Sequence, residues 1–241
     1  MTGGGGILPY EVMNAYERLV TALEDASCRA NCGTIKCTEP LLARFRLEQG
    51  GLVIFDGCLH LIEWKARGSS AKKRVNILIH IQELIRRSDR VLLRSTVRVC
   101  YFNIEQTTAT LLLSVHFDYG PEQDAHPVFH AQVSNQPIEL PAKDAEGLEF
   151  QFAPAPSDPV CFNNARIPTA DMTFPSVLLC LAADHLGQPF FSEFMEQIRD
   201  LQGKMPLAGF EKLKGSIASE PNHLRSSHWF AHMLKPLQET N

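Results

Sequence analysis

The pattern of apolar and polar positions predicts a helix at the start of the chain, followed by strands. Apolar residues recur every three to four positions across residues 8–30, which is typical of a helix with one buried face. Apolar and polar residues alternate across residues 41–48 and 91–104, and a period of two predicts strands. A nearly continuous apolar run over residues 109–115 predicts a further strand, which leads into a polar stretch.

Turn residues predict how these strands connect. Asp56 and Gly57 separate two apolar stretches, residues 52–55 and 58–64, and an Asp-Gly pair in this setting predicts a tight hairpin. Residues 91–133 contain three strand-like segments with short connections, so we expect them to form a three-stranded antiparallel meander.

Helices are expected in two other regions. Residues 75–87 place isoleucines and leucines at helical spacing and end in two arginines, where cations complement the helix dipole. Thr173 is suited to cap a helix that extends to residue 186, and a second helix is expected over residues 190–201. The proline-rich residues 135–159 predict a long loop with one short strand.

These elements together predict an α+β fold. We expect a mostly antiparallel sheet of five to seven strands, packed by the N-terminal helix and by a C-terminal helical layer. Residues 1–135 would hold the first helix and the sheet, and residues 136–165 would form a loop or linker. Residues 166–241 would form the C-terminal helical part of the same domain.

Composition restricts the partners and the compartment. The net charge of −4 gives no overall positive field, so any contact with nucleic acid must use a local basic patch. Seven cysteines, an odd number spread through apolar segments, suggest reduced thiols and a cytoplasmic location. No apolar run reaches the roughly 18 residues that a membrane span needs, so no membrane partner is expected.

Histidine and aspartate residues gather near the end of the apolar strand. His116 and Asp118 are two positions apart and therefore share one face of a strand. His126 and His130 follow a short turn, and pairing of the two segments would bring all four side chains together. Such a cluster could bind a divalent metal, perform acid–base catalysis on a phosphodiester, or hydrogen-bond to loop backbone.

Basic residues supply candidate phosphate ligands. Lys72, Lys73 and Arg74 precede the helix expected over residues 75–87, and with the two arginines at its end they form the best local basic patch, for which a solvated helix end is the structural alternative. Arg166 lies beyond the proline-rich loop, which begins beside the histidines, so the loop could return this arginine to them. We assign Lys72, Lys73, Arg74 and Arg166 to substrate binding.

A loose family resemblance supports a role in RNA cleavage. An apolar strand ends in aromatic–Asp–aromatic at residues 117–119, and a Pro/His-rich segment follows at residues 126–132. This outline resembles small bacterial proteins encoded with toxin–antitoxin or phage-defence loci, including the TumE-like toxins. The resemblance implies an RNA-directed, toxin-like activity, with catalysis by His116, Asp118, His126 and His130.

A second motif suggests a different nuclease. Glu63 and Lys65 have the E-x-K spacing and resemble half of the PD-(D/E)xK nuclease motif. That resemblance implies a divalent metal held between Glu63 and a first acid, Glu48 or Asp56, with Lys65 orienting water and Gln82 as a trailing glutamine. A solvent-facing ion pair on a strand is the structural alternative.

Three functions follow from these patterns. The leading hypothesis is a cytoplasmic, toxin-like or defence-associated bacterial nuclease that acts on RNA through the histidine/aspartate cluster. The second is a metal-dependent DNA nuclease that uses Glu63 and Lys65. The third is a non-catalytic subunit that binds a partner protein or an antitoxin, for which we expect an exposed apolar patch on the C-terminal helices.

Overall fold

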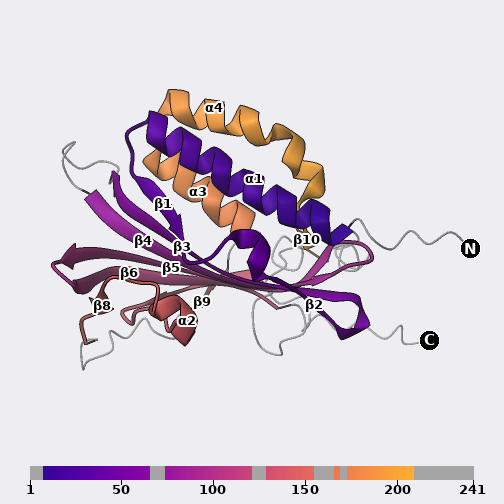
Figure 1. Ribbon diagram of the computed structural model, residues 1–241, viewed down its shortest axis with the longest axis horizontal. Helices are drawn as coiled ribbons and strands as arrows, with labels where there is room; N and C mark the ends of the chain where they lie inside the picture. The colour runs from indigo at the N-terminus through magenta and orange to yellow at the C-terminus, as the bar shows by residue number, and fades with distance from the viewer. Residues whose placement is uncertain (1–7, 66–73, 121–128, 155–165, 169–172, 209–241) are drawn as a thin grey trace, which may run out of the picture.

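The computed structural model confirms the predicted α+β class. It describes residues 8–65, 74–120, 129–154, 166–168 and 173–208. One mostly antiparallel sheet packs against a layer of helices drawn from both ends of this part of the chain (Figure 1).

Seven strands form the main path of the sheet, in the order β1-β3-β4-β5-β6-β7-β9. In that order, their bounds are Thr34–Cys37, Leu52–Lys65, Arg74–Arg86, Val91–Glu105, Thr108–Tyr119, Phe129–Ser134 and Arg166–Pro168. All neighbours on this path are antiparallel, so the predicted meander of β5, β6 and β7 is confirmed. Three short strands lie off the path: β2 (Phe45–Glu48), β8 (Gln151–Phe152) and β10 (Leu207–Ala208).

The helix layer consists of α1 (Leu8–Arg29), α3 (Phe174–His185) and α4 (Gln188–Ile198), which cover one face of the sheet (Figure 1). Short 3-10 turns occur at Leu41–Arg44, Gln49–Gly51 and Arg199–Lys204. Helices were therefore correctly expected at the start of the chain and near its C-terminal end. Within the described ranges, no helix combines the length and apolar character that crossing a membrane requires.

A carboxylate from the sheet fixes the start of α3. Thr173 precedes the helix, as predicted, but makes no side-chain cap bond. Instead, the backbone N–H of Phe174 donates to Glu83 of β4 at 3.1 Å, and Tyr16 of α1 donates its hydroxyl to the same carboxylate at 2.5 Å. This buried Glu83 thus links the sheet to two helices.

The opposite face of the sheet is covered by a segment from the predicted loop. Residues 135–154 contain the four-residue helix α2 (Ala142–Ala145) and the strand β8. Ile138 and Phe150 from this segment are buried against Leu78 and Phe102 of the sheet, forming a second, smaller core. The described part of the loop is therefore a packed cover on the sheet.

The helix predicted over residues 75–87 is wrong, because this stretch forms strand β4. Val75, Ile77, Ile79 and Ile81 lie two apart, and all four are buried against the helix layer. Their spacing of two competes with the three- and four-residue spacings that suggested a helix, and β-branched side chains favour the strand. The basic patch expected at residues 72–74 therefore does not lie at the start of a helix.

The hairpin predicted at Asp56 and Gly57 is also wrong, because both residues lie inside the continuous strand β3. A Cβ added at Gly57 would lie 2.8 Å from Cζ of Phe55. Glycine at this position therefore lets an aromatic ring lie against the backbone, rather than forming a turn. The strand expected over residues 41–48 is only partly correct, because its first half is a 3-10 turn.

A one-residue bulge changes the pairing of β5 with β6. Phe102 lies opposite Leu111 and Tyr101 lies opposite Leu113, so Leu112 has no cross-strand partner. Beyond this bulge the register is shifted by one residue, and Arg98 lies opposite His116.

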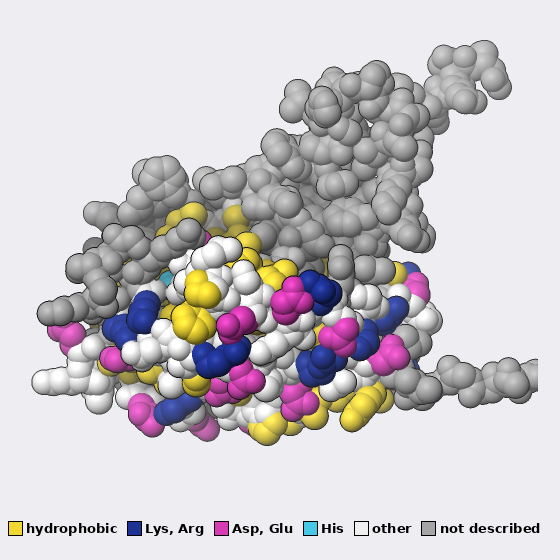
Figure 2. Space-filling view, turned by 90° about the horizontal axis from the view of Figure 1, so that it is seen from above, with side chains coloured by type: hydrophobic (Ala, Val, Ile, Leu, Met, Phe, Trp, Pro, Cys, Tyr) yellow, Lys and Arg dark blue, Asp and Glu magenta, His cyan; other side chains and the backbone are white. Residues whose placement is uncertain are grey.

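The outer surface of the helix layer carries both signs of charge. Seen from above the helices, Lys and Arg side chains are interspersed with Asp and Glu side chains (Figure 2). Arg18 pairs with Asp200 at 2.8 Å and Arg29 pairs with Glu193 at 2.7 Å, and all four side chains are exposed. A mixed surface of this kind does not concentrate the positive potential that attracts a nucleic-acid backbone.

Candidate functional site

The sheet face away from the helix layer carries polar side chains in two neighbouring rows. Cross-strand partners point to the same face of a sheet, so the register identifies the members of each row. One row runs from β3 to β7 through Asp56, Gln82, Thr96, Asp118 and His130. The next row runs through Cys58, His80, Arg98, His116 and Gln132.

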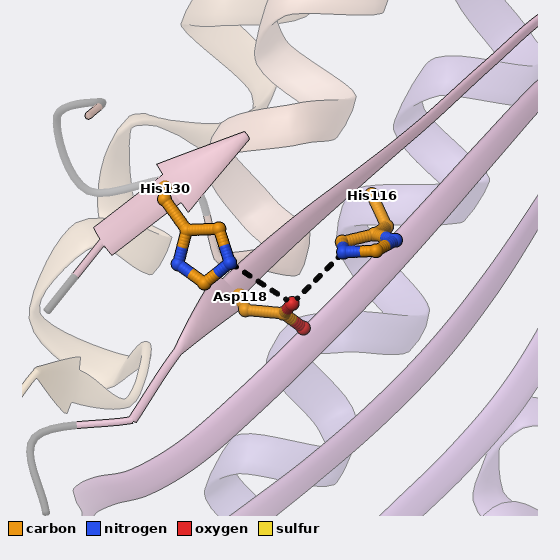
Figure 3. Close-up of side chains that lie close together, drawn as sticks. All are labelled: His116, Asp118 and His130. Atoms are coloured by element: carbon orange, nitrogen blue, oxygen red, sulfur yellow. Dashed lines mark ion pairs between the residues drawn. The ribbon is translucent and has the colours of Figure 1, made fainter. Parts of the chain in front are cut away.

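Two imidazoles converge on one carboxylate oxygen at the β6–β7 end of these rows (Figure 3). Oδ2 of Asp118 lies 3.1 Å from Nε2 of His116 and 3.4 Å from Nε2 of His130. The exposed fractions of the side chains are 29% for His116, 27% for Asp118 and 4% for His130. The cluster is therefore open on the side of His116 and Asp118 and closed on the side of His130.

The environment keeps Asp118 ionised. Burial acts to raise the pKa of this carboxyl group, but hydrogen bonds from His116 and Thr96 outweigh it and lower the pKa. The charges of His116 and His130 act in the same direction as the hydrogen bonds. Asp118 thus presents a carboxylate to both histidines at neutral pH.

A cavity of about 240 Å³ adjoins this cluster and is lined by Arg98, Ser114, His116, Ser134 and residues 136–139. Arg98 is half-buried and makes no hydrogen bond or ion pair with any residue in the described part of the chain. A guanidinium carries five N–H donors in a planar fork that suits phosphate or carboxylate oxygens. The cavity therefore offers an unpaired cation beside His116.

Sequence reasoning assigned this cationic role to other residues. The backbone of Arg166 does return to the sheet, in β9 opposite Gln132, but its side chain lies outside what the structure describes. Arg74 donates to the carbonyl oxygen of Glu63 at 2.9 Å and also to that of Cys32. The bond to Cys32 connects β4 to the segment that follows α1. His126, Lys72 and Lys73 lie outside the described residues.

The residues of the E-x-K alternative are not brought together. Glu63 is seven positions from Asp56 along β3, or about 23 Å at the usual rise of a strand. Glu48 pairs with Leu52 at the far end of the same strand, which is farther still. Lys65 donates from Nζ to the carbonyl of Ala30 at 2.8 Å and so caps the last turn of α1. This geometry contradicts a shared metal site for Glu63 and either candidate acid, even though Gln82 does lie opposite Asp56.

A second histidine/aspartate cluster lies deeper under the 135–154 cover. Ligand atoms of Asp56, His80 and Asp144 all lie within 4.8 Å of one another, and His80 and Asp144 are buried. Asp144 is paired with the buried Arg44 and accepts a hydrogen bond from Thr38 at 2.9 Å. Sequence reasoning missed this cluster because Asp144 belongs to a stretch without a strand or helix pattern.

Comparisons with known proteins add no relative. No protein-family model, no curated protein and no solved structure matches this chain. The residues that bear on function are therefore the two clusters, Arg98 and the other residues that line the cavity.

Proposed function

We propose that this protein cleaves phosphodiester bonds in RNA at the His116–Asp118–His130 cluster. The observation that carries the proposal is the position of Arg98, which is unpaired among the described residues and faces the same cavity as His116. His116, as the activating group, and Arg98, as the cation that binds the substrate, are thus held on the adjacent strands β6 and β5. Rigid strands hold catalytic groups more accurately than loops do.

Arg98 would bind the phosphate of the scissile bond. Its planar donors can contact two phosphate oxygens at once, and they stabilise the negative charge that develops in the transition state. Because the protein carries a net charge of −4, this local cation matters more than any long-range attraction.

Two serines in the cavity favour RNA over DNA. The hydroxyl groups of Ser114 and Ser134 line the same cavity as Arg98. A serine hydroxyl both donates and accepts, so it is suited to contact the ribose 2′-hydroxyl that distinguishes the two nucleic acids.

RNA cleavage by the purified full-length protein tests the proposal. We expect wild-type protein to shorten mixed RNA and His130→Ala to lose this activity, because His130 holds one side of the Asp118 carboxylate. Arg94→Gln is a matched control, since Arg94 is an exposed arginine on the same strand as Arg98. Equal cleavage by wild type and His130→Ala, or cleavage by neither, contradicts the proposal.

The alternative of a non-catalytic interaction subunit receives less support. The large exposed apolar residues of the described part are Tyr10, Leu47, Leu112, Leu113 and Met195. They come from four different elements, and only Met195 lies on a C-terminal helix, in α4. A toxin-like or defence-associated setting remains a prediction from the motif resemblance, and an antitoxin partner remains a prediction of this alternative.

A further inference from the structure

We propose that His116, Asp118 and His130 bind one divalent first-row transition-metal ion, such as Zn²⁺ or Mn²⁺. Its catalytic role rests on the proposed function: the bound ion would supply the water that attacks the RNA phosphate. The metal site itself is a separate claim, and it is tested by binding.

The distances within the cluster fit a metal centre. An ion bonded at about 2.0–2.1 Å to each donor requires neighbouring donor atoms to be about 2.9–3.4 Å apart for angles between octahedral and tetrahedral. Asp118 Oδ2 lies 3.1 and 3.4 Å from the two imidazole nitrogens. All three donor atoms lie within 4.8 Å of one another, so small side-chain rotations would complete the site.

The donor types select the kind of ion. Two imidazole nitrogens and one carboxylate oxygen suit zinc, iron, manganese and related ions, whereas calcium and magnesium prefer sites made only of oxygen. Three protein ligands also leave coordination positions open, as a catalytic centre requires.

The sheet holds the three ligands in place. Asp118 and His130 are direct cross-strand partners, and His116 lies two residues from Asp118 on the same face of β6. Thr96, the partner of Asp118 on the other side, hydrogen-bonds to its carboxylate and so orients the ligand from behind. Such outer contacts are a regular feature of metal sites in proteins.

The cavity gives the ion access to substrate. The exposed edges of His116 and Asp118 leave one side of the cluster open, while His130 closes the other side. Arg98 lies opposite His116, so a phosphate bound by its guanidinium would sit next to the open coordination positions.

The chemical step is a hydrolysis. A bound Zn²⁺ ion would lower the pKa of its water to about 7, so that this water would release a proton to solvent and become hydroxide. The hydroxide oxygen forms a bond to phosphorus, the ester P–O bond breaks, and the leaving oxygen takes up a proton from solvent. No oxidant or further reactant is needed.

Metal titration of the full-length protein tests the site. Protein stripped with a chelator is titrated with Zn²⁺ by calorimetry and with Co²⁺ by visible absorption, for the wild type, His130→Gln and Asp118→Asn. We expect each variant to lose one bound ion per chain, or to bind it at least tenfold more weakly, and to lose the corresponding Co²⁺ absorption. His185→Gln is the control, because His185 lies in α3 on the other side of the sheet.

Mn²⁺ broadening of imidazole proton signals in the wild-type protein gives a readout that does not depend on variant folding. We expect substoichiometric Mn²⁺ to broaden the signals of His116 and His130 before those of His185. No ion bound by the wild type, the same binding by wild type and variants, or broadening that spares both histidines overturns the metal site.

RNA cleavage separates the two proposals. Cleavage that resists chelation but is lost in His130→Ala, without metal binding, refutes the metal site and keeps the nuclease. Metal binding without cleavage refutes the nuclease and keeps the metal site.

Discussion

Two clusters of histidine and aspartate on one sheet face have similar compositions but opposite surroundings. In the first cluster, His116 borders a cavity that Arg98 also lines, and Arg98 makes no ion pair in the described part of the chain. In the other cluster Asp144 is buried, and its charge is balanced by Arg44, whose side chain is 1% exposed. Burial and charge balance, rather than residue type, therefore separate a candidate reactive centre from a structural one.

The buried cluster is better suited to holding the fold than to binding a metal. A cation at Asp56, His80 and Asp144 would be repelled by the guanidinium of Arg44, which already binds Asp144 and lies 3.0 Å from Glu39. In the open cluster, Asp118 pairs with the imidazoles of His116 and His130, and no lysine or arginine among the described residues forms an ion pair with it.

The largest expected effect tests this difference through stability. Asp144→Asn leaves the buried Arg44 charge without its main partner, so the free energy of unfolding should fall by about 3–5 kcal/mol. Asp118→Asn affects a partly exposed carboxylate and should cost only about 1 kcal/mol. Urea unfolding of both variants measures the contrast, and equal losses would mean that the two clusters have the same structural role.

The next effect concerns catalysis. Arg98→Gln should lower kcat/KM for RNA by about 100-fold, or roughly 2.7 kcal/mol of transition-state stabilisation, because it removes the charge that binds phosphate. Its stability should stay within about 0.5 kcal/mol of wild type. Arg94→Gln should cleave normally, and a matching decrease in that variant would assign the effect to surface charge in general.

A smaller effect depends on pH. Burial, helped by the charge of Arg98, lowers the pKa of His80 despite the opposing effects of Asp56 and Asp144. The unfolded chain takes up the proton near pH 6.5 and the folded protein only at lower pH, so the stabilising contribution is complete above pH 6.5.

Stability should therefore fall as the pH drops below this value, by at most about 1.4 kcal/mol per pH unit for this one proton. Unfolding measured from pH 8 to 5 tests this sign. His80→Gln should show a shallower slope over that range, and an unchanged slope would exclude His80 as the source.

The smallest expected effect is on stability, and it concerns Glu63 of the E-x-K alternative. Glu63 has a φ of 53°, a left-handed conformation that glycine adopts without the strain of a side chain. Glu63→Gly should therefore raise the free energy of unfolding by up to about 1 kcal/mol and leave nuclease activity unchanged. Thermal unfolding and an RNA and DNA cleavage assay check both parts, and loss of DNA cleavage would restore the catalytic role of Glu63.

The spacing of apolar residues predicted a sheet correctly, and it identified the strands β5 and β6, but it gave the wrong structure for β4. The alternation over residues 91–104 and the apolar run over residues 109–115 identified β5 and β6, whose patterns have no competing interpretation. In β4 the apolar side chains fit both periods, and in β3 the Asp-Gly pair fits a turn as well as a strand. Those conflicts were resolved by tertiary packing, here the helix layer and the ring of Phe55, which local patterns do not contain.

The members of the open cluster could be predicted from the strand pattern, but the position of Arg98 beside them could not. A period of two placed His116 and Asp118 on one face, and the meander brought His130 to them. Counting back from the turn at Gln106 and Thr107 would place Val97 opposite His116, and only the bulge at Leu112 brings Arg98 there instead. No sequence feature marks that bulge, so the cation could not be assigned beforehand.

The cover over the sheet connects the two clusters. Residues 136–139, which form a wall of the cavity, run directly into α2, where Asp144 is held by Arg44. Further along, backbone N–H groups of Gln151 and Ala153 bond to Thr107 and Ala109 at 2.9 Å. The stretch is thus held in place by these hydrogen bonds and by the buried Arg44–Asp144 ion pair. Its amide hydrogens should therefore exchange with solvent as one cooperative unit. The Arg44–Asp144 pair does not line the cavity, yet it then sets the free energy that is needed to open the cavity.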